Sequence, residues 1–164
     1  MDKYEKTACQ YRMTYDHHTH TIYSHGKGTI EDNVKTAAAK GLSSIAITDH
    51  GPGHLTYGMK MEKIPEIKAE IQRLRDIYPS VRVLLGVEAN TLRVPPYLDI
   101  TEKDKQQLDI LLAGYHFGIL KAGMVPNYIY SRTGAFGSGS SSLLVKNTDM
   151  ILKALYENKI DILT

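Results

Sequence analysis

Four of the seven histidines in this chain lie between residues 17 and 25. His18 and His20 follow a short run with Met13 and Tyr15 that is typical of a strand. On an extended chain, residues two apart point to the same side, so these two imidazoles can reach one ion. His25 can return to the same ion from the following turn. A lone histidine is usually a hydrogen-bonded structural group, but this cluster favours a metal site, with His17 alternating away from it.

Three further apolar segments are predicted as strands, and each is followed by another potential ligand. Residues 45–47 lead into His50, residues 81–87 end at Glu88, and residues 109–113 lead into His116. Strands that alternate with helical segments predict an α/β fold with mainly parallel strands. In such folds the functional groups lie at the carboxyl ends of the strands, so we expect these side chains to meet there.

Helical patterns separate these strands. Thr29 is a suitable N-cap for a helix with acidic residues in its first turn, and Gly41 is its expected stop. Residues 63–78 place isoleucines and Leu74 at helical spacing before Pro79. A Gly/Ser tract at 134–142 precedes another helical pattern. It could bind phosphate, but it matches no phosphate-loop consensus, so a surface loop is favoured. Residues 160–164 are predicted as a final strand.

The composition is typical of one ordinary domain. The chain has 164 residues, 42% of them hydrophobic, and a formal net charge of +2, which provides no basic surface for nucleic acid or an anionic membrane. The single cysteine, Cys9, excludes an internal disulfide and fits a reducing compartment. Residues 1–6 lack an apolar signal segment, and no stretch approaches the roughly 18 apolar residues of a membrane span. We therefore expect a cytoplasmic protein.

Four ordered motifs resemble those of the PHP (polymerase and histidinol phosphatase) domain family. They are YDHHTH at 15–20, AITDHG at 46–51, GVEAN at 86–90 and AGYH at 113–116. The resemblance runs from about residue 13 to the end and is strongest to small stand-alone bacterial phosphoesterases. It implies a short N-terminal extension (1–12) followed by the N-terminal portion of a PHP domain (13–164).

The resemblance implies a distorted (β/α)7 barrel, similar to a TIM barrel, with two or three divalent ions (zinc, manganese or iron) at the carboxyl ends of its strands. The implied metal ligands are His18, His20, His25, His50, Glu88 and His116, with Glu88 bridging two ions. The family's later His-Pro-Gly and Asp-x-His segments have no counterpart here, so about three of nine ligands are absent. We therefore expect an incomplete barrel of about five βα units.

This resemblance implies hydrolysis of a small phosphate monoester, as in a histidinol phosphatase, by a metal-bound hydroxide between ions about 3.5–4 Å apart. The residues expected to carry catalysis are His18, His20, His50, Glu88 and His116. Asp16 and Asp49 adjoin ligand histidines and could orient their rings, although caps of strand ends or loops explain them equally well.

Other side chains near the predicted strand ends could contact a small phosphorylated substrate. The basic candidates are Lys27, Lys60, Arg93 and Arg132, and solvated surface charge is the favoured interpretation of each. A solvated loop side chain is also favoured for His54 over a substrate contact.

Two other functions are compatible with these motifs. The chain could be a truncated metal-binding domain that does not complete catalysis, and its open sheet edge then favours self-association. A proofreading domain of a DNA polymerase shares the motifs, but neither a polymerase chain nor a basic channel is visible. Neither nucleic acid nor a membrane is an expected partner.

Overall fold

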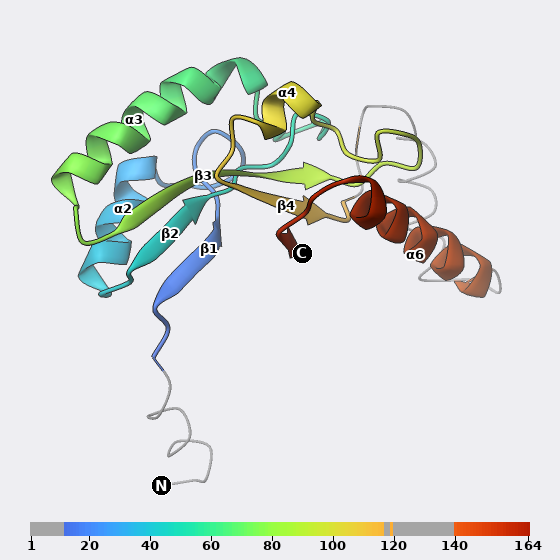
Figure 1. The fold of residues 1–164 in the computed structure, drawn as a ribbon, viewed down its shortest axis with the longest axis horizontal. Helices are drawn as coiled ribbons and strands as arrows, with labels where there is room; N and C mark the ends of the chain where they lie inside the picture. The colour runs from blue at the N-terminus through green and yellow to red at the C-terminus, as the bar shows by residue number, and fades with distance from the viewer. Residues whose placement is uncertain (1–11, 117–118, 120–139) are drawn as a thin grey trace, which may run out of the picture.

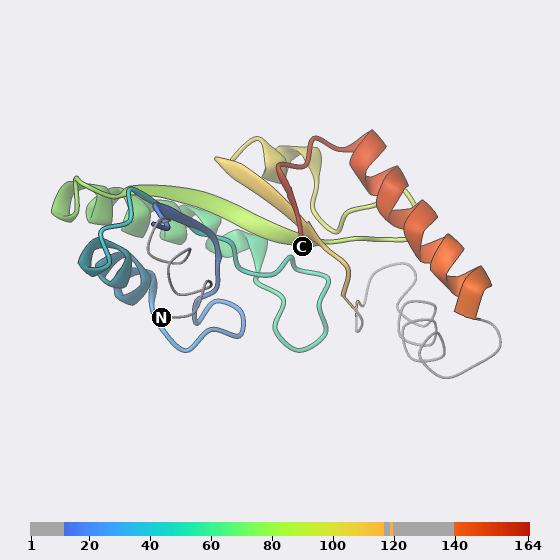
Figure 2. The same ribbon diagram turned by 90° about the horizontal axis from the view of Figure 1, so that it is seen from below.

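The computed structural model describes residues 12–116, 119 and 140–164. Its elements, in chain order, are β1 (Tyr15–Thr19), α2 (Ile30–Ala39), β2 (Ser44–Ile47), the 3-10 turn η1 (Met61–Lys63), α3 (Ile64–Ile77), β3 (Arg82–Asn90), α4 (Glu102–Lys105), β4 (Ile110–Gly114), α6 (Ser140–Glu157) and β5 (Ile162–Leu163). All neighbouring strands pair in parallel, in the order β1-β2-β3-β4-β5. The sheet curls into a half-barrel (Figures 1 and 2), which confirms the predicted α/β barrel class in an incomplete form.

Helices α2 and α3 pack together against β1, β2 and β3 (Figure 1). Their apolar faces supply Val34, Ile67 and Leu74, each at most 1% exposed, to one continuous core with the inward residues of the strands. Burial of such side chains stabilises each by about 1.5–3 kcal/mol. This packing fixes the strands whose carboxyl ends carry the predicted ligands.

The ends of α2 follow from local chemistry. The Thr29 hydroxyl accepts a hydrogen bond from the Asp32 amide, and the Asp32 carboxylate accepts one from the Thr29 amide, which forms a capping box. Gly41 follows the helix with φ of +67°, a conformation that glycine adopts without strain. The predicted cap and stop of this helix are both confirmed.

The structure differs from the sequence prediction at β3. This strand was expected to end before Glu88 but continues to Asn90, because Glu88, Ala89 and Asn90 pair with Leu112, Ala113 and Gly114 of β4. Glu88 therefore stands on a rigid strand rather than in a loop. The short helix α4, which also begins with a capping box, at Thr101 and Asp104, was not predicted.

Some predictions fall partly or wholly outside the described residues. Cys9, Arg132 and most of the Gly/Ser tract lie there, whereas residues 140–142 open α6. The final strand is present but spans only Ile162–Leu163. Within the described residues, every helix is too short or too polar to cross a membrane.

Candidate metal centre

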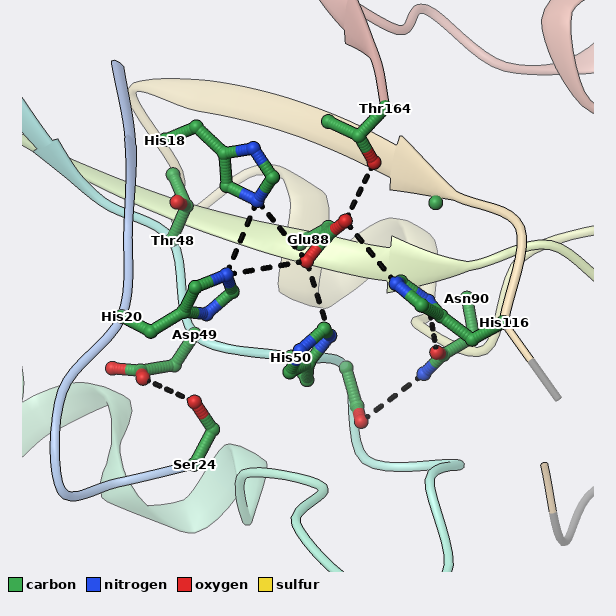
Figure 3. A network of polar contacts seen from close by, with 12 residues as sticks. His18, His20, Ser24, Thr48, Asp49, His50, Glu88, Asn90, His116 and Thr164 are labelled. Carbon is green, nitrogen blue, oxygen red and sulfur yellow. Dashed lines mark hydrogen bonds and ion pairs between the residues drawn. The ribbon is translucent and has the colours of Figure 1, made fainter. Parts of the chain in front are cut away.

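The buried Glu88 carboxylate stands at the middle of a ring of imidazoles (Figure 3). Its Oε2 atom lies 3.2 Å from His18 Nε2, 3.5 Å from His20 Nε2 and 3.1 Å from His50 Nδ1. The Oε1 atom lies 3.3 Å from His116 Nε2. Imidazoles on β1 or following β1, β2 and β4 therefore converge on one carboxylate of β3 that is 2% exposed.

His25 joins the cluster from the loop between β1 and α2. Its ring centroid lies 4.5 Å from that of His20 and 4.9 Å from that of His50. The loop is tight, because a Cβ atom at Gly26 would lie 2.6 Å from the His20 carbonyl carbon. The glycine thus lets the chain fold back far enough to bring His25 beside the other rings.

The six candidate ligands form three overlapping groups of donor atoms. Within each group the donor atoms lie within 4.8 Å of one another, and the groups are His20–His25–His50, His18–His20–Glu88 and His50–Glu88–His116. Glu88 belongs to two of them and offers two oxygens, whereas an imidazole nitrogen serves one ion. This sharing is the geometry that a bridging carboxylate requires.

Burial keeps two of these rings uncharged at neutral pH. Desolvation lowers the pKa of His50 to about 3 and also lowers that of His20. Burial alone would raise the pKa of Glu88, but hydrogen bonds from His116 and Thr164 and the nearby His50 hold it below its usual range. The rings of His20 and His50 are therefore neutral beside an ionised carboxylate, which is the protonation state that a divalent cation needs.

Three buried polar atoms in this cluster lack a hydrogen-bond partner. They are His20 Nδ1, His50 Nδ1 and Glu88 Oε2. The last two lie 3.1 Å apart but are not aligned for a hydrogen bond. Buried polar atoms without partners are costly, and a metal ion would satisfy lone pairs of this kind. Nitrogen and carboxylate oxygen donors also suit zinc, iron and manganese, so the residues present fit the predicted ions.

The predicted role of Asp49 and Asp16 in orienting imidazoles does not appear in the geometry. Asp49 is 1% exposed and accepts hydrogen bonds from the Thr21 amide at 2.7 Å, the Thr21 hydroxyl at 2.6 Å and the Ser24 hydroxyl at 2.5 Å. It therefore holds the loop that carries His20 and His25. Asp16 accepts a 3.3 Å hydrogen bond from the backbone amide of His18 and caps the strand locally.

Two further histidines lie outside the candidate ligand set. His17 points away from the cluster, hydrogen-bonds the Ser44 hydroxyl at 2.9 Å and stacks on Tyr15, as predicted. The solvated loop predicted for His54 is wrong, because the ring is 8% exposed and stacks on Tyr57 with centroids 3.5 Å apart. The glycine-rich loop folds over the site rather than into solvent.

The described basic candidates lie at different depths. Lys27 and Lys60 are exposed, in agreement with the favoured interpretation. Arg93 is half-buried and donates a 2.8 Å hydrogen bond to Asn147 of α6. This contact links the loop after β3 to that helix.

Sequence reasoning missed three polar residues that support the cluster. The Thr164 hydroxyl, directly after β5, donates a 2.5 Å hydrogen bond to Glu88 Oε1. Asn90 accepts from His116, and Asp99 in turn accepts from Asn90. Position at a predicted strand end was the signal that could have identified Thr164, whereas no spacing rule points from Asn90 to Asp99.

The protein is therefore a half-barrel of parallel βα units. Imidazoles and one carboxylate meet at the C-terminal ends of its strands and form a candidate metal centre. The chain belongs to the PHP domain family, because the model of the PHP domain matches residues 16–158. The resemblance of the four motifs is thereby confirmed.

Curated relatives of the chain are small phosphatases by description. A "Probable phosphatase" of Caldanaerobacter subterraneus is 38% identical over 117 residues, which cover 68% of this chain and 42% of the relative. One of Shewanella piezotolerans is 31% identical over 139 residues, covering 81% of this chain and 52% of the relative. The chain thus spans about half or less of the length of these relatives.

A solved structure supports the fold. The crystal structure of a candidate histidinol phosphatase from Listeria monocytogenes matches with a TM-score of 0.51 and 20% identity, covering 63% of this chain and 45% of that chain. At this identity the match bears on the architecture alone.

Proposed function

We propose that the Glu88 cluster binds divalent metal ions and that the protein is a metal-dependent phosphoesterase for small phosphate monoesters. The observation that carries the proposal is the convergence of four imidazoles on one buried carboxylate, at 3.1–3.5 Å from its oxygens. In the proposed site His18, His20, His25, His50, Glu88 and His116 are the metal ligands. The descriptions of the curated relatives as phosphatases support the reaction class.

Each group of the chain has a defined task in this proposal. Glu88 holds two donor groups together, and the neutral rings of His20 and His50 provide lone pairs without first losing a proton. Bound divalent ions would neutralise charge on the phosphoryl oxygens and make a water molecule more acidic. Asp49 and Thr164 hold the ligand loop and the carboxylate in place.

The substrate class follows from charge and relatives together. The cluster is a compact cationic centre once loaded, at the rim of a chain whose net charge is only +2, so it favours a small anion over a polyanion. We infer a metabolite phosphate such as histidinol phosphate, since the solved structure with the same fold is described as a candidate histidinol phosphatase.

A panel of phosphate monoesters, including histidinol phosphate, tests the activity. Phosphate release by the metal-loaded chain should fall to background in Glu88→Gln, because the amide cannot bridge two ions as a carboxylate does. His17→Ala is the matched control, since this ring points away from the cluster, and its rate should stay close to that of the starting chain. Full turnover in Glu88→Gln would contradict the proposal.

A second candidate function is metal binding without turnover. It is favoured by coverage of only 42% of the length of a curated relative, because ligands outside the matched part then complete the site. Under this alternative the chain binds metal, Glu88→Gln weakens binding, and no monoester is hydrolysed by either protein. The same panel, measured together with metal content, separates the two functions.

A further inference from the structure

Asp99 is a buried carboxylate outside the candidate ligand set. After β3 the chain turns back, Leu98 pairs antiparallel with Thr91, and Asp99 comes to lie beside Asn90 at 3% exposure. Its carboxylate accepts hydrogen bonds from the Asn90 amide at 2.8 Å and from Asn90 Nδ2 at 2.5 Å. The Gly53 amide donates a third at 2.7 Å. One carboxylate therefore joins the end of β3 to the loop that follows His50.

The loop after His50 is built closely around this carboxylate. A Cβ atom at Gly51 would lie 2.6 Å from Asp99 Oδ2, and one at Gly53 would lie 2.8 Å from the same oxygen. Because real Cβ atoms do not come this close to an oxygen atom, any residue larger than glycine at these two positions would collide with the Asp99 carboxylate. The Gly-Pro-Gly segment therefore encloses the Asp99 carboxylate.

Asp99 fixes which way the side-chain amide of Asn90 points. Asn90 is fully buried, and its Nδ2 donates to Asp99 Oδ2 and, at 3.2 Å, to the Gly51 carbonyl. Since both of these partners are acceptors, the nitrogen of the amide must face them. The Oδ1 atom is left to face His116 Nδ1, 2.9 Å away.

This orientation determines where the proton of His116 resides. An amide oxygen only accepts, so Nδ1 of the ring must donate to it. With its Nδ1 hydrogen-bonded to Asn90, the ring has Nε2 as the nitrogen left to bind an ion. In His116 that nitrogen lies 3.3 Å from Glu88 Oε1 and belongs to a candidate donor group.

We propose that Asp99 and Asn90 are positioning residues that hold a proton on Nδ1 of His116 and keep Nε2 facing Glu88. Asp99 acts through Asn90, and Asn90 acts on the ring. The step from tautomer to metal affinity rests on the proposed function, whereas the tautomer itself is a property of the metal-free chain. Such partners typically change metal affinity by about 10- to 100-fold.

The ring nitrogens of the metal-free chain provide the direct test. Two-bond 1H–15N correlation spectra distinguish the two tautomers of each histidine, and His116 is assigned with a His116→Gln variant. In the starting chain Nδ1 of His116 should carry a proton. In Asn90→Leu the acceptor is lost, and the Nε2–H form should grow because Glu88 Oε1 becomes the nearest acceptor. Asp99→Asn should produce a smaller shift in the same direction by loosening the Asn90 amide.

Asp109→Asn is the matched control. Asp109 also accepts a backbone hydrogen bond, from the Leu85 amide at 2.9 Å, but it precedes β4 at the opposite end of that strand. Its loss should lower the unfolding temperature while leaving the tautomer of His116 unchanged. A purely structural role for Asp99 would make the two aspartate variants alike in both measurements.

Zinc affinity, measured by competition with a chromophoric chelator, should fall about tenfold or more in Asn90→Leu. An unchanged tautomer in folded Asn90→Leu overturns the proposal, and if that variant does not fold, an unchanged tautomer in Asp99→Asn does so. If the starting chain binds no zinc while the tautomer still shifts, the proposed function fails and the positioning of the ring stands.

Discussion

Gly114 is not a candidate ligand, but its missing side chain leaves room for two of the candidate ligands. It ends β4, and a Cβ atom placed there would overlap His116 Cε1 and lie 2.6 Å from Glu88 Oε1. The His116 ring and the Glu88 carboxylate therefore occupy the volume that a side chain would need. Absence of a side chain at this position is part of how the cluster is assembled.

The substitution Gly114→Ala should consequently damage the centre selectively. The added methyl group pushes His116 and Glu88 apart, and we expect zinc affinity to fall about tenfold or more. Competition titration against a chelator measures this. Gly28→Ala is the control, since the atoms nearest to its Cβ belong to Asp32 and Asn33, at 3.3 Å or more, and not to a candidate ligand. Equal zinc affinities in the two variants would contradict the claim that a side chain at position 114 displaces His116 and Glu88.

Burial of His50 predicts how the stability of the metal-free chain depends on pH. Its pKa is about 3 in the folded chain, against an ordinary value of 6.5 for histidine, so the unfolded chain binds the proton more readily between these values. The free energy of unfolding should therefore have its full value above about pH 6.5 and should decrease as the pH falls toward 3. Urea unfolding in chelator, from about pH 7.5 to about pH 5, checks this sign.

His50→Gln is the comparison for that experiment because it removes the titrating group. Its stability should change less with pH over the same range. The window stays above the ordinary pKa of 4.5 for Glu88, so protonation of carboxylates does not dominate. A starting chain that is as stable at about pH 5 as at about pH 7.5 would contradict the shift.

Residue types and strand-end positions were sufficient to predict that the candidate ligands meet, but not the contacts that support them. His18, His50 and Glu88 are recognisable because each has metal-binding chemistry next to an apolar strand. Asn90 and Asp99 are nine residues apart and meet only because the chain turns back after β3. That contact depends on tertiary structure, and local patterns do not specify it.

At the scale of elements, helices with caps were the most predictable parts of the chain. Thr29 and Gly41 bound α2 through local hydrogen bonds and backbone conformation, which sequence encodes directly. The true end of β3 was missed because pairing with β4 extends it to Asn90. Strand length is decided by the neighbouring strand, whereas a helix end is decided within a few residues.

The capping box of α2 provides a test at this scale. Thr29→Ala removes the hydroxyl that accepts from the Asp32 amide and should lower the free energy of unfolding by about 1 kcal/mol. Thr36→Ala, in the exposed part of the same helix, should be neutral or slightly stabilising because alanine has the higher helix propensity. Urea unfolding of both variants distinguishes the cap from a general effect of losing a threonine.

The whole molecule explains why a site assembled from short motifs can be rigid. Five parallel strands bring their carboxyl ends to one edge, and side chains on or following β1, β2, β3, β4 and β5 all reach the same cluster. Ions bound there would connect β1, β2, β3 and β4 through the candidate ligands, so metal binding and folding should be coupled. The predicted self-association of the open sheet stays a prediction.

The central claim is that the Glu88 cluster holds divalent ions, and the metal content of the purified chain tests it most directly. Elemental mass spectrometry, before any ion is added, should find about two or three ions of zinc, manganese or iron per chain. In Glu88→Gln the content should fall below about one, because the shared carboxylate is lost. Less than about one ion in the starting chain would contradict the account.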